Sequence, residues 1–217
     1  MCFLALVMTS EDFVDYLLSA GGVIAENKDY VTELDAKTGD GDHWVNLNMG
    51  FEKIASIAHE LKALRPADML KKVGMTMMSS VGGSSGVLYG SAYMAAGKAV
   101  GDEVEINMAT LHNILEAMQQ AIMARGHVEP GFKTMLDSLH IAVRQMKDAL
   151  DEGKSDADVM VALKDGARIG MEATRDMEAV KGRASYQTNK GVGNLDPGAV
   201  TMCMQLECLA DTAMAKL

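Results

Sequence analysis

The chain has 217 residues, of which 48% are hydrophobic and 23% charged, and its formal net charge is -10. This length can bury the core of one domain or at most two, and the composition is that of a globular protein. The negative charge argues against general nucleic-acid binding, because few basic side chains remain to neutralise phosphates, whereas it suits a protein that binds cations. Cys2, Cys203 and Cys208 lack a CxxC spacing, which indicates a reducing compartment without disulfides or structural zinc.

The first eight residues, MCFLALVM, are apolar. They carry no basic stretch and no small-residue cleavage site, and they are too short to cross a bilayer, so a signal peptide or membrane anchor is not indicated. We expect an N-terminal extension over residues 1–8, which either precedes a native start at Met8 or docks on a neighbour. We also expect one domain over residues 9–217, and a cytoplasmic protein that does not associate with membranes.

The apolar period then predicts helices almost throughout, without an alternating strand of useful length. The first five expected helices cover residues 10–26, 28–36, 43–62, 66–80 and 87–100. Residues 111–126 form the next, with Gly126 as its C-terminal cap. A further helix opens at Pro130 and Gly131 and continues to Gly153.

Two helices close the chain. Ser155 and Asp158 have the spacing of a capping box and open a helix that reaches residue 174. Asp196 and Pro197 suit the N-cap and first residue of the last helix, which runs to the C-terminus. The sequence therefore predicts an all-α, single-domain bundle of about eight amphipathic helices.

Three glycine-bearing connections between helices stand out: TGDGD (38–42), VGGSSG (81–86) and GRASYQTNKGVGNLDPGA (182–199). Glycine-rich loops that lead into a helix present free backbone N–H groups and the positive end of the helix dipole, which favour phosphate. Ser84 and Ser85 add hydroxyl donors. The same composition also forms ordinary interhelical turns, and the spacings of a P-loop, an EF-hand or a zinc site are absent.

An acidic cluster occupies the first of these connections. Asp40 and Asp42 flank Gly41, and Asp35 lies five residues before Asp40. Such a cluster is either a solvated surface turn or a site for a hard cation such as magnesium, which keeps several waters and bridges to phosphates. His43 and Asn46 follow at the start of a helix. If the neighbouring glycine-rich loops bind phosphate, the phosphate and the aspartate carboxylates are both negative and need a cation between them. The interpretation as a cation site therefore predicts magnesium here.

Four segments, ELDAKTGDGDH (33–43), GMTMMSSVGGSSGVLYG (74–90), EPGFKTMLD (129–137) and GRASY with GVGNLDPGA (182–199), occur in the order of one family. Together they resemble the nucleotide-binding L-subunit family of bacterial dihydroxyacetone kinases. The resemblance implies a barrel of eight mostly antiparallel helices with ADP or ATP tightly bound at one end. It places two Mg²⁺ ions on Asp35, Asp40 and Asp42. Arg183 would be a catalytic lid residue whose guanidinium follows phosphate charge during transfer. The implied nucleotide contacts are His43, Trp44, Val45, Asn46, Ser84, Ser85, Gly126, Met135, Arg183, Asp196, Pro197 and Gly198.

The family's reaction moves a phosphoryl group to dihydroxyacetone, which a separate K subunit holds covalently. A free-standing L subunit resembles the phosphotransferase-system type, in which bound ADP is rephosphorylated in place by an M subunit that carries phosphohistidine. Three alternatives stay open: an ATP-dependent kinase subunit for another short ketose or aldose, a nucleotide-loaded module that docks on a transcriptional regulator, and a helical scaffold without ligand. A homodimer is compatible with each.

The chain departs from the family pattern at Trp44, where glycine is usual, at Phe132, where aspartate is usual, and at Asn194 and Leu195. The magnesium ligands are intact. The departures leave the acceptor sugar and the partner open. Trp44 either faces the phosphates or anchors its helix against a neighbouring one.

Overall fold

The computed structural model describes residues 5–217, and these residues are helical over most of their length. The helices of the described residues are α1 (Ser10–Glu26), α2 (Lys28–Thr38), α3 (His43–Ser56), α4 (Ala58–Lys62), α5 (Pro66–Ser80), α6 (Gly83–Val100), α7 (Met108–Gly126), α8 (Met135–Asp151), α9 (Asp156–Ala173) and α10 (Pro197–Met214). Two short 3₁₀ helices, η1 (Thr174–Asp176) and η2 (Arg183–Tyr186), and a pair of two-residue strands, β1 (Val7–Met8) and β2 (Ile106–Asn107), complete the elements. The predicted all-α class is confirmed.

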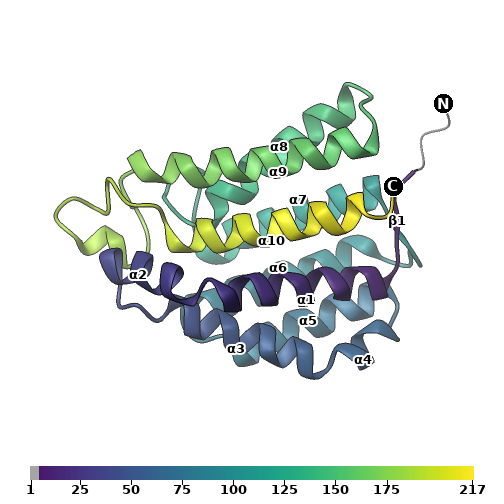
Figure 1. Ribbon diagram of the computed structural model, residues 1–217, viewed down its shortest axis with the longest axis horizontal. Helices are drawn as coiled ribbons and strands as arrows, with labels where there is room; N and C mark the ends of the chain where they lie inside the picture. The colour runs from purple at the N-terminus through teal and green to yellow at the C-terminus, as the bar shows by residue number, and fades with distance from the viewer. Residues whose placement is uncertain (1–4) are drawn as a thin grey trace.

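The long helices lie side by side along the long axis of the molecule (Figure 1). Neighbours in sequence pack as antiparallel hairpins, α5 with α6 and α8 with α9, and α10 packs against α1, α8 and α9. Apolar side chains that these helices turn inward form one large core, which includes the fully buried Phe13, Leu17, Tyr89 and Tyr93. Burial of this apolar surface holds the bundle together.

Helix boundaries differ most from the sequence-based expectation at three places. The predicted helix 43–62 is broken at Ile57 into α3 and α4. Helix α8 begins at Met135 instead of Pro130, because the Thr134 side chain caps it and Asp137 completes the capping box. Helix α6 begins at Gly83, so Ser84 and Ser85 lie in its first turn and not in a loop.

The predicted caps agree better with the structure. Ser155 caps α9 by accepting a hydrogen bond from the Asp158 N–H, and Asp196 caps α10 with Pro197 in its first turn. Gly126 is the last residue of α7, while the left-handed cap conformation falls on His127 (φ 50°). The sequence therefore located this helix end correctly and its cap one residue too early.

Part of the predicted N-terminal extension belongs to the core of the chain itself. Leu6 and Met8 are buried, and β1 pairs antiparallel with β2, with Val7 opposite Asn107. The Leu6 N–H also donates to Asp156 Oδ2 at 2.6 Å. The rest of the extension, residues 1–4, lies outside the described residues.

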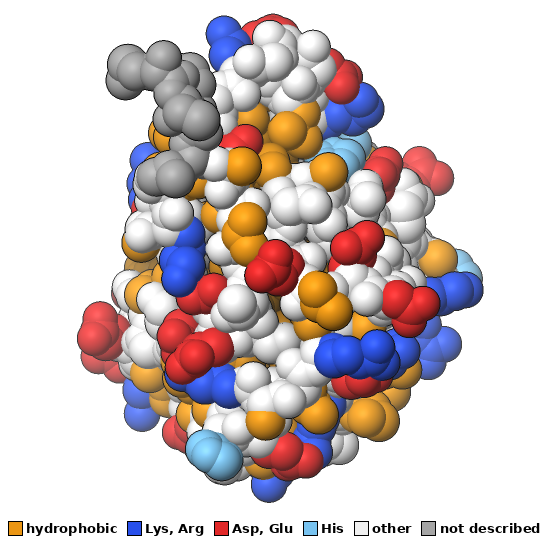
Figure 2. All heavy atoms as spheres, turned by 90° about the vertical axis from the view of Figure 1, so that its right-hand side faces the viewer, with side chains coloured by type: hydrophobic (Ala, Val, Ile, Leu, Met, Phe, Trp, Pro, Cys, Tyr) orange, Lys and Arg blue, Asp and Glu red, His pale blue; other side chains and the backbone are white. Residues whose placement is uncertain are grey.

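The end of the molecule that carries β1 and the C-terminus (Figure 1) has a mixed surface. Figure 2 looks onto this end and shows acidic, basic and apolar side chains interspersed over it. In the described range 5–217, none of the helices has the length and apolar character needed to span a membrane. Cys203 and Cys208 are buried free thiols, and Cys2 is among the residues not described.

Candidate functional site

A cavity of about 620 Å³ lies at the opposite end of the bundle, on the left of Figure 1 beside α2. The N-terminal ends of four helices meet there: α3, α6, α8 and α10. Its lining includes Asp35, Thr38, Asp40, Asp42, His43, Asn46, Gly82, Gly83, Ser84, Ser85, Val87, Leu88, Ile122, Arg125, Gly126, Val128, Lys133, Thr134, Met135, Lys181, Gly182, Arg183, Ala184, Asp196, Pro197 and Gly198. Four positive helix-dipole ends directed at one cavity favour an anion inside it.

The four helix ends differ in how their free N–H groups are used. Side chains of Thr134 and Asp196 cap α8 and α10. At α3 the N-cap Asp42 makes no such bond, and the N-cap of α6, Gly82, has no side chain to make one. The first-turn N–H groups of α6 are thus left for solvent or a ligand. At α3 the His43 N–H donates to Asp35 Oδ2 at 3.0 Å, which orients that carboxylate at the cavity wall.

The three aspartates come together as the metal prediction requires. One carboxylate oxygen from each of Asp35, Asp40 and Asp42 lies within 4.8 Å of the other two. Asp35 is buried, and the other two are exposed. Gly39 permits this approach, since a Cβ atom there would lie 2.6 Å from Asp35 Oδ1. Oxygen donors of this kind, partly open to water, fit a magnesium ion that keeps some of its waters.

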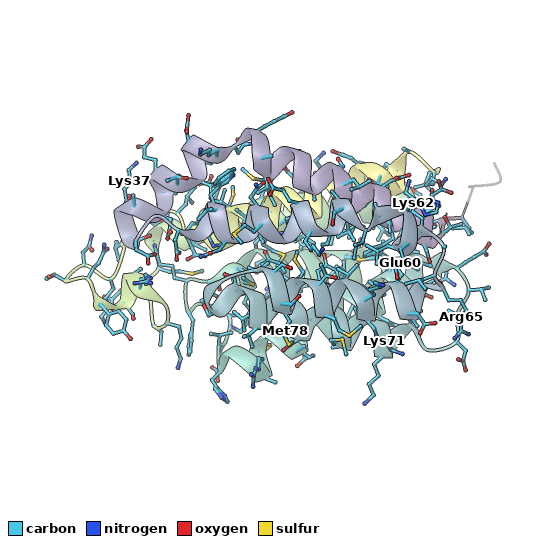
Figure 3. The ribbon with its side chains drawn as sticks, turned by 90° about the horizontal axis from the view of Figure 1, so that it is seen from below. Lys37, Glu60, Lys62, Arg65, Lys71 and Met78 are labelled. Carbon is cyan, nitrogen blue, oxygen red and sulfur yellow. The ribbon has the colours of Figure 1, made fainter. Side chains whose placement is uncertain are left out.

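Arg183 reaches the same cluster from the opposite wall. It lies in η2, within the connection between α9 and α10, and its Nη2 is 2.5 Å from Asp40 Oδ2. Gln187 of the same connection donates to the Lys37 carbonyl at 2.8 Å. Figure 3 shows Lys37 at the end of the molecule from which this connection projects, whereas Glu60, Lys62 and Arg65 lie toward the other end. The connection therefore spans the cavity mouth from α9 and α10 to α2.

Most residues predicted as nucleotide contacts line the cavity. These are His43, Asn46, Ser84, Ser85, Gly126, Met135, Arg183, Asp196, Pro197 and Gly198. Several apolar residues that the sequence did not single out form another part of the wall, among them Val87, Leu88, Ile122 and Val128. An apolar wall opposite charged groups is suited to one end of an amphiphilic ligand.

Two predicted contacts do not bring their side chains into the cavity. The Trp44 Nε1–H donates to the Ile24 carbonyl at 2.8 Å, and Lys28 Nζ lies 5.1 Å from the centroid of the indole ring. Val45 is 45% exposed on the outer face of α3. Successive residues point about 100° apart around a helix, so His43 and Asn46 can face the cavity while Trp44 and Val45 face elsewhere. The reading of Trp44 as a helix anchor fits this geometry.

His43 and Asp196 have altered proton affinities because they are withdrawn from water. Burial lowers the pKa of His43 below its ordinary value. Its Nε2 is 2.9 Å from Thr201 Oγ1, within hydrogen-bonding distance. Burial raises the pKa of Asp196 to about 7, against the opposing effect of a hydrogen bond from the Ala199 N–H. At neutral pH, His43 is therefore protonated less, and Asp196 more, than the same residue in water.

Fold and cavity together define a class: an all-helical domain with an acidic, glycine-lined cavity at one end. The chain belongs to the DAK2 domain family, whose pattern matches residues 37–211. It is 35% identical over 208 residues to the PEP-dependent dihydroxyacetone kinase 2, ADP-binding subunit DhaL, of Listeria innocua, covering 95% of this chain and 96% of that protein. It is 32% identical over 206 residues to the PEP-dependent dihydroxyacetone kinase, ADP-binding subunit DhaL, of Escherichia coli, covering 94% and 97%.

A solved structure shares the fold. The dihydroxyacetone kinase of C. freundii, in complex with AMP-PNP and Mg²⁺, superposes with a TM-score of 0.68 at 27% identity. The match covers 91% of this chain and 33% of that longer one. The family resemblance seen in the sequence is confirmed.

Proposed function

We propose that this chain is the ADP-binding subunit of a phosphoenolpyruvate-dependent dihydroxyacetone kinase, a phosphotransferase. The names of the relatives from Listeria innocua and Escherichia coli support this assignment, because the similarity extends over nearly the full length of each chain. Tight binding of ADP, its rephosphorylation in place by an M subunit, and dihydroxyacetone as acceptor on a K subunit belong to the same proposal.

The observation that carries the proposal is the position of the uncapped N-terminus of α6 and of the α3 N-terminus beside the three-aspartate cluster. Helix N-termini bind phosphate, and carboxylates repel it, so the two features are compatible when a divalent cation lies between them. Asp35, Asp40 and Asp42 would hold two Mg²⁺ ions. Held there, the ions would supply positive charge that offsets the charge of the phosphates.

The residues of the chain act by binding and positioning. The first-turn N–H groups of α6, with the Ser84 and Ser85 hydroxyls, hold phosphate oxygens, and the apolar wall around Leu88 and Ile122 takes the nucleobase. Arg183 stabilises charge on the phosphoryl group in transit. No side chain of this chain needs to attack phosphorus, because the acceptor hydroxyl belongs to the sugar on the K subunit.

Reconstitution tests the assignment. The isolated chain, with ATP and dihydroxyacetone, should give no dihydroxyacetone phosphate. Product should appear once a K subunit, an M subunit and a phosphoenolpyruvate-fed phosphoryl donor are added, and catalytic ADP should suffice. Turnover by this chain alone would refute the subunit assignment. Turnover with a K subunit and ATP, without an M subunit, would instead favour the ATP-dependent type.

A second measurement tests the cofactor directly. Protein denatured straight from purification should release ADP, detected by mass spectrometry in amounts close to one per chain. ADP without phosphoryl transfer in the reconstituted system would redirect the assignment to a nucleotide-loaded module that docks on a regulator. Absence of nucleotide together with absence of transfer would leave the scaffold reading.

A further inference from the structure

A buried lysine lies beneath the connection that carries Arg183. Lys133 is 2% exposed, although it lies in the turn-rich segment before α8 and has a left-handed backbone (φ 62°). A buried ammonium group is costly unless it is well hydrogen-bonded. Lys133 Nζ donates to two main-chain carbonyls, that of Thr174 at 2.6 Å and that of Asn194 at 2.7 Å. Burial lowers the pKa of Lys133, while nearby carboxylates led by Asp196 oppose this effect.

The two carbonyls belong to the two ends of one loop. Thr174 directly follows α9, and Asn194 lies two residues before Asp196, the N-cap of α10. We call residues 175–193 between them the Arg183 loop. Other bonds draw the same ends together: the Gly193 N–H donates to the Arg175 carbonyl at 2.8 Å, and the Asp196 N–H donates to Thr174 Oγ1 at 3.0 Å. The ammonium group contributes the charged bonds at this base, which are stronger than neutral ones.

The Arg183 loop also rests on the lysine stem. Gly191 has a left-handed backbone (φ 72°), and a Cβ atom there would lie 3.1 Å from Lys133 Cε. Most side chains of the loop are exposed, and Tyr186 extends fully into solvent. A segment with so few buried apolar contacts depends on its hydrogen bonds for its position. Its contacts across the cavity are those of Arg183 with Asp40 and of Gln187 with Lys37.

We propose that Lys133 is a positioning residue, whose ammonium group clamps both ends of the Arg183 loop and thereby sets the reach of Arg183 over the metal and phosphate end of the cavity. This role rests on the proposed function where it concerns phosphoryl transfer. The clamp itself is a property of the protein without ligand. The two parts can therefore be tested separately.

Proteolysis tests the clamp. Lys181, Arg183 and Lys190 are trypsin sites within the Arg183 loop. Lys133→Met keeps the length of the stem and removes the charged bonds, so cleavage at these three sites should accelerate about tenfold or more. Lys164→Met is the matched control, since Lys164 Nζ also donates two bonds, to both carboxylate oxygens of Asp211. It should leave cleavage of the Arg183 loop at the wild-type rate.

A second variant keeps the test valid if Lys133→Met fails to fold. Gly191→Val places a side chain against both Lys133 Cε and Ala184 Cβ, each 3.1 Å from the added Cβ, so it lifts the loop from the lysine stem while Lys133 keeps its ammonium group. It should accelerate cleavage at the same sites. Wild-type cleavage rates in Gly191→Val, and in Lys133→Met where that variant folds, would overturn the clamp.

A double-mutant cycle tests the link to Arg183, measured as phosphoryl transfer with the K and M subunits. Lys133→Met should lower the turnover number about tenfold or more while the affinity for ADP with Mg²⁺ changes little. In an Arg183→Met background the same substitution should have little further effect, since both act through one group. Equal losses in both backgrounds would overturn the positioning role.

Absence of transfer in the wild-type protein would instead refute the proposed function and leave the proteolysis result to decide the clamp.

Discussion

At the scale of single residues, the acidic cluster carries more negative charge than the neighbouring basic side chain of Arg183 offsets. Asp35, Asp40 and Asp42 bring three carboxylates within one small volume, and the ion pair between Asp40 and Arg183 offsets part of their repulsion. An exposed pair of this kind contributes about 1 kcal/mol or less. The remaining repulsion is a reason for the cluster to take up a cation, and it makes the apo protein tolerant of losing one carboxylate.

Asp42→Asn should therefore separate binding from stability. Loss of the negative charge from a proposed metal ligand should weaken ADP binding in the presence of Mg²⁺ by more than about tenfold, since even partners of a ligand affect metal affinity by that factor. The apo protein should unfold at the same temperature or slightly higher, because a like charge is removed. Isothermal calorimetry and thermal unfolding measure the two effects. Asp102→Asn, in an exposed turn away from the cavity, is the control, and equal ADP affinity in both variants would contradict the metal assignment.

Asp196 should give the protein a characteristic pH dependence. Its pKa rises from 3.8 to about 7 in the folded state. The folded state thus binds more protons than the unfolded state between these values, so this group makes stability fall as pH rises through that window and stay constant above it. Asp196→Asn removes the effect and keeps a good N-cap. Its free energy of unfolding relative to wild type, from urea titrations, should increase from about pH 4 to 7. Parallel curves would contradict the raised pKa.

Trp44 should report on helix packing and not on ligand. Trp44→Phe removes the hydrogen bond to the Ile24 carbonyl, so it should lower the free energy of unfolding by about 1 kcal/mol. ADP affinity in the presence of Mg²⁺ should be unchanged, in contrast to Asp42→Asn. In the wild type the emission of this single tryptophan should change little on adding ADP and Mg²⁺. A large reversible shift would place the indole nearer to the phosphates than its contact with α1 implies.

At the scale of elements, α5 and α6 pack so closely that their contact depends on glycine. A Cβ atom at Gly74 would lie 2.9 Å from the Gly90 carbonyl oxygen and the Met94 backbone nitrogen, and backbone cannot move aside cheaply. Gly74→Ala should therefore lower the free energy of unfolding by about 1–3 kcal/mol. Gly22 in α1 has no atom within 4 Å of the same position, so Gly22→Ala should raise it by about 0.5–1 kcal/mol. Urea titrations of both variants measure this difference, and equal signs would contradict the packing.

Helix positions were predictable where local signals set them. Pro66 and the Asp196–Pro197 pair fixed the starts of α5 and α10 because proline at the first helical turn is a local preference. The break at Ile57 was missed, since the apolar period continues through it. The pairing of β1 with β2 was also missed, because two-residue strands leave no alternating pattern and depend on contacts distant in sequence.

The candidate site was predictable to the same extent. Asp35, Asp40, Asp42 and the serines of α6 carry their chemistry in their type and spacing. Lys133 was missed, because a single lysine close to Pro130 and Gly131 indicates an exposed turn. Its burial arises from contacts with Thr174 and Asn194, which lie 41 and 61 residues later in the chain. The direction of the Trp44 side chain was likewise not predictable, because the adjacent residue His43 does face the cavity.

At the scale of the whole molecule, the net charge and the arrangement of the helices have opposite effects on an anionic ligand. The chain has a formal charge of -10, yet it directs four helix N-termini at one cavity. The dipoles favour an anion, while the acidic cluster and the net charge oppose one. A ligand that carries both a divalent cation and phosphate, as in the proposed function, would satisfy both. Binding of such a ligand would join α2, α3 and α6 with the Arg183 loop, so it should stabilise the bundle as a unit.

Thermal unfolding of the intact protein tests this coupling. ADP with Mg²⁺ at about 100 times its dissociation constant should stabilise the folded state by about 2.7 kcal/mol, through linkage of binding to folding. For a chain of this length that raises the midpoint of unfolding by about 5–10 °C. ADP with a chelator should raise it far less, because phosphate then meets uncompensated carboxylates, and Mg²⁺ alone should give an intermediate shift. The Asp42→Asn variant should lose most of the response to the combination, whereas Asp102→Asn should keep it. The same shift with and without Mg²⁺ would show that the nucleotide binds away from the acidic cluster, and the cavity between α3, α6 and the Arg183 loop would then not be its site.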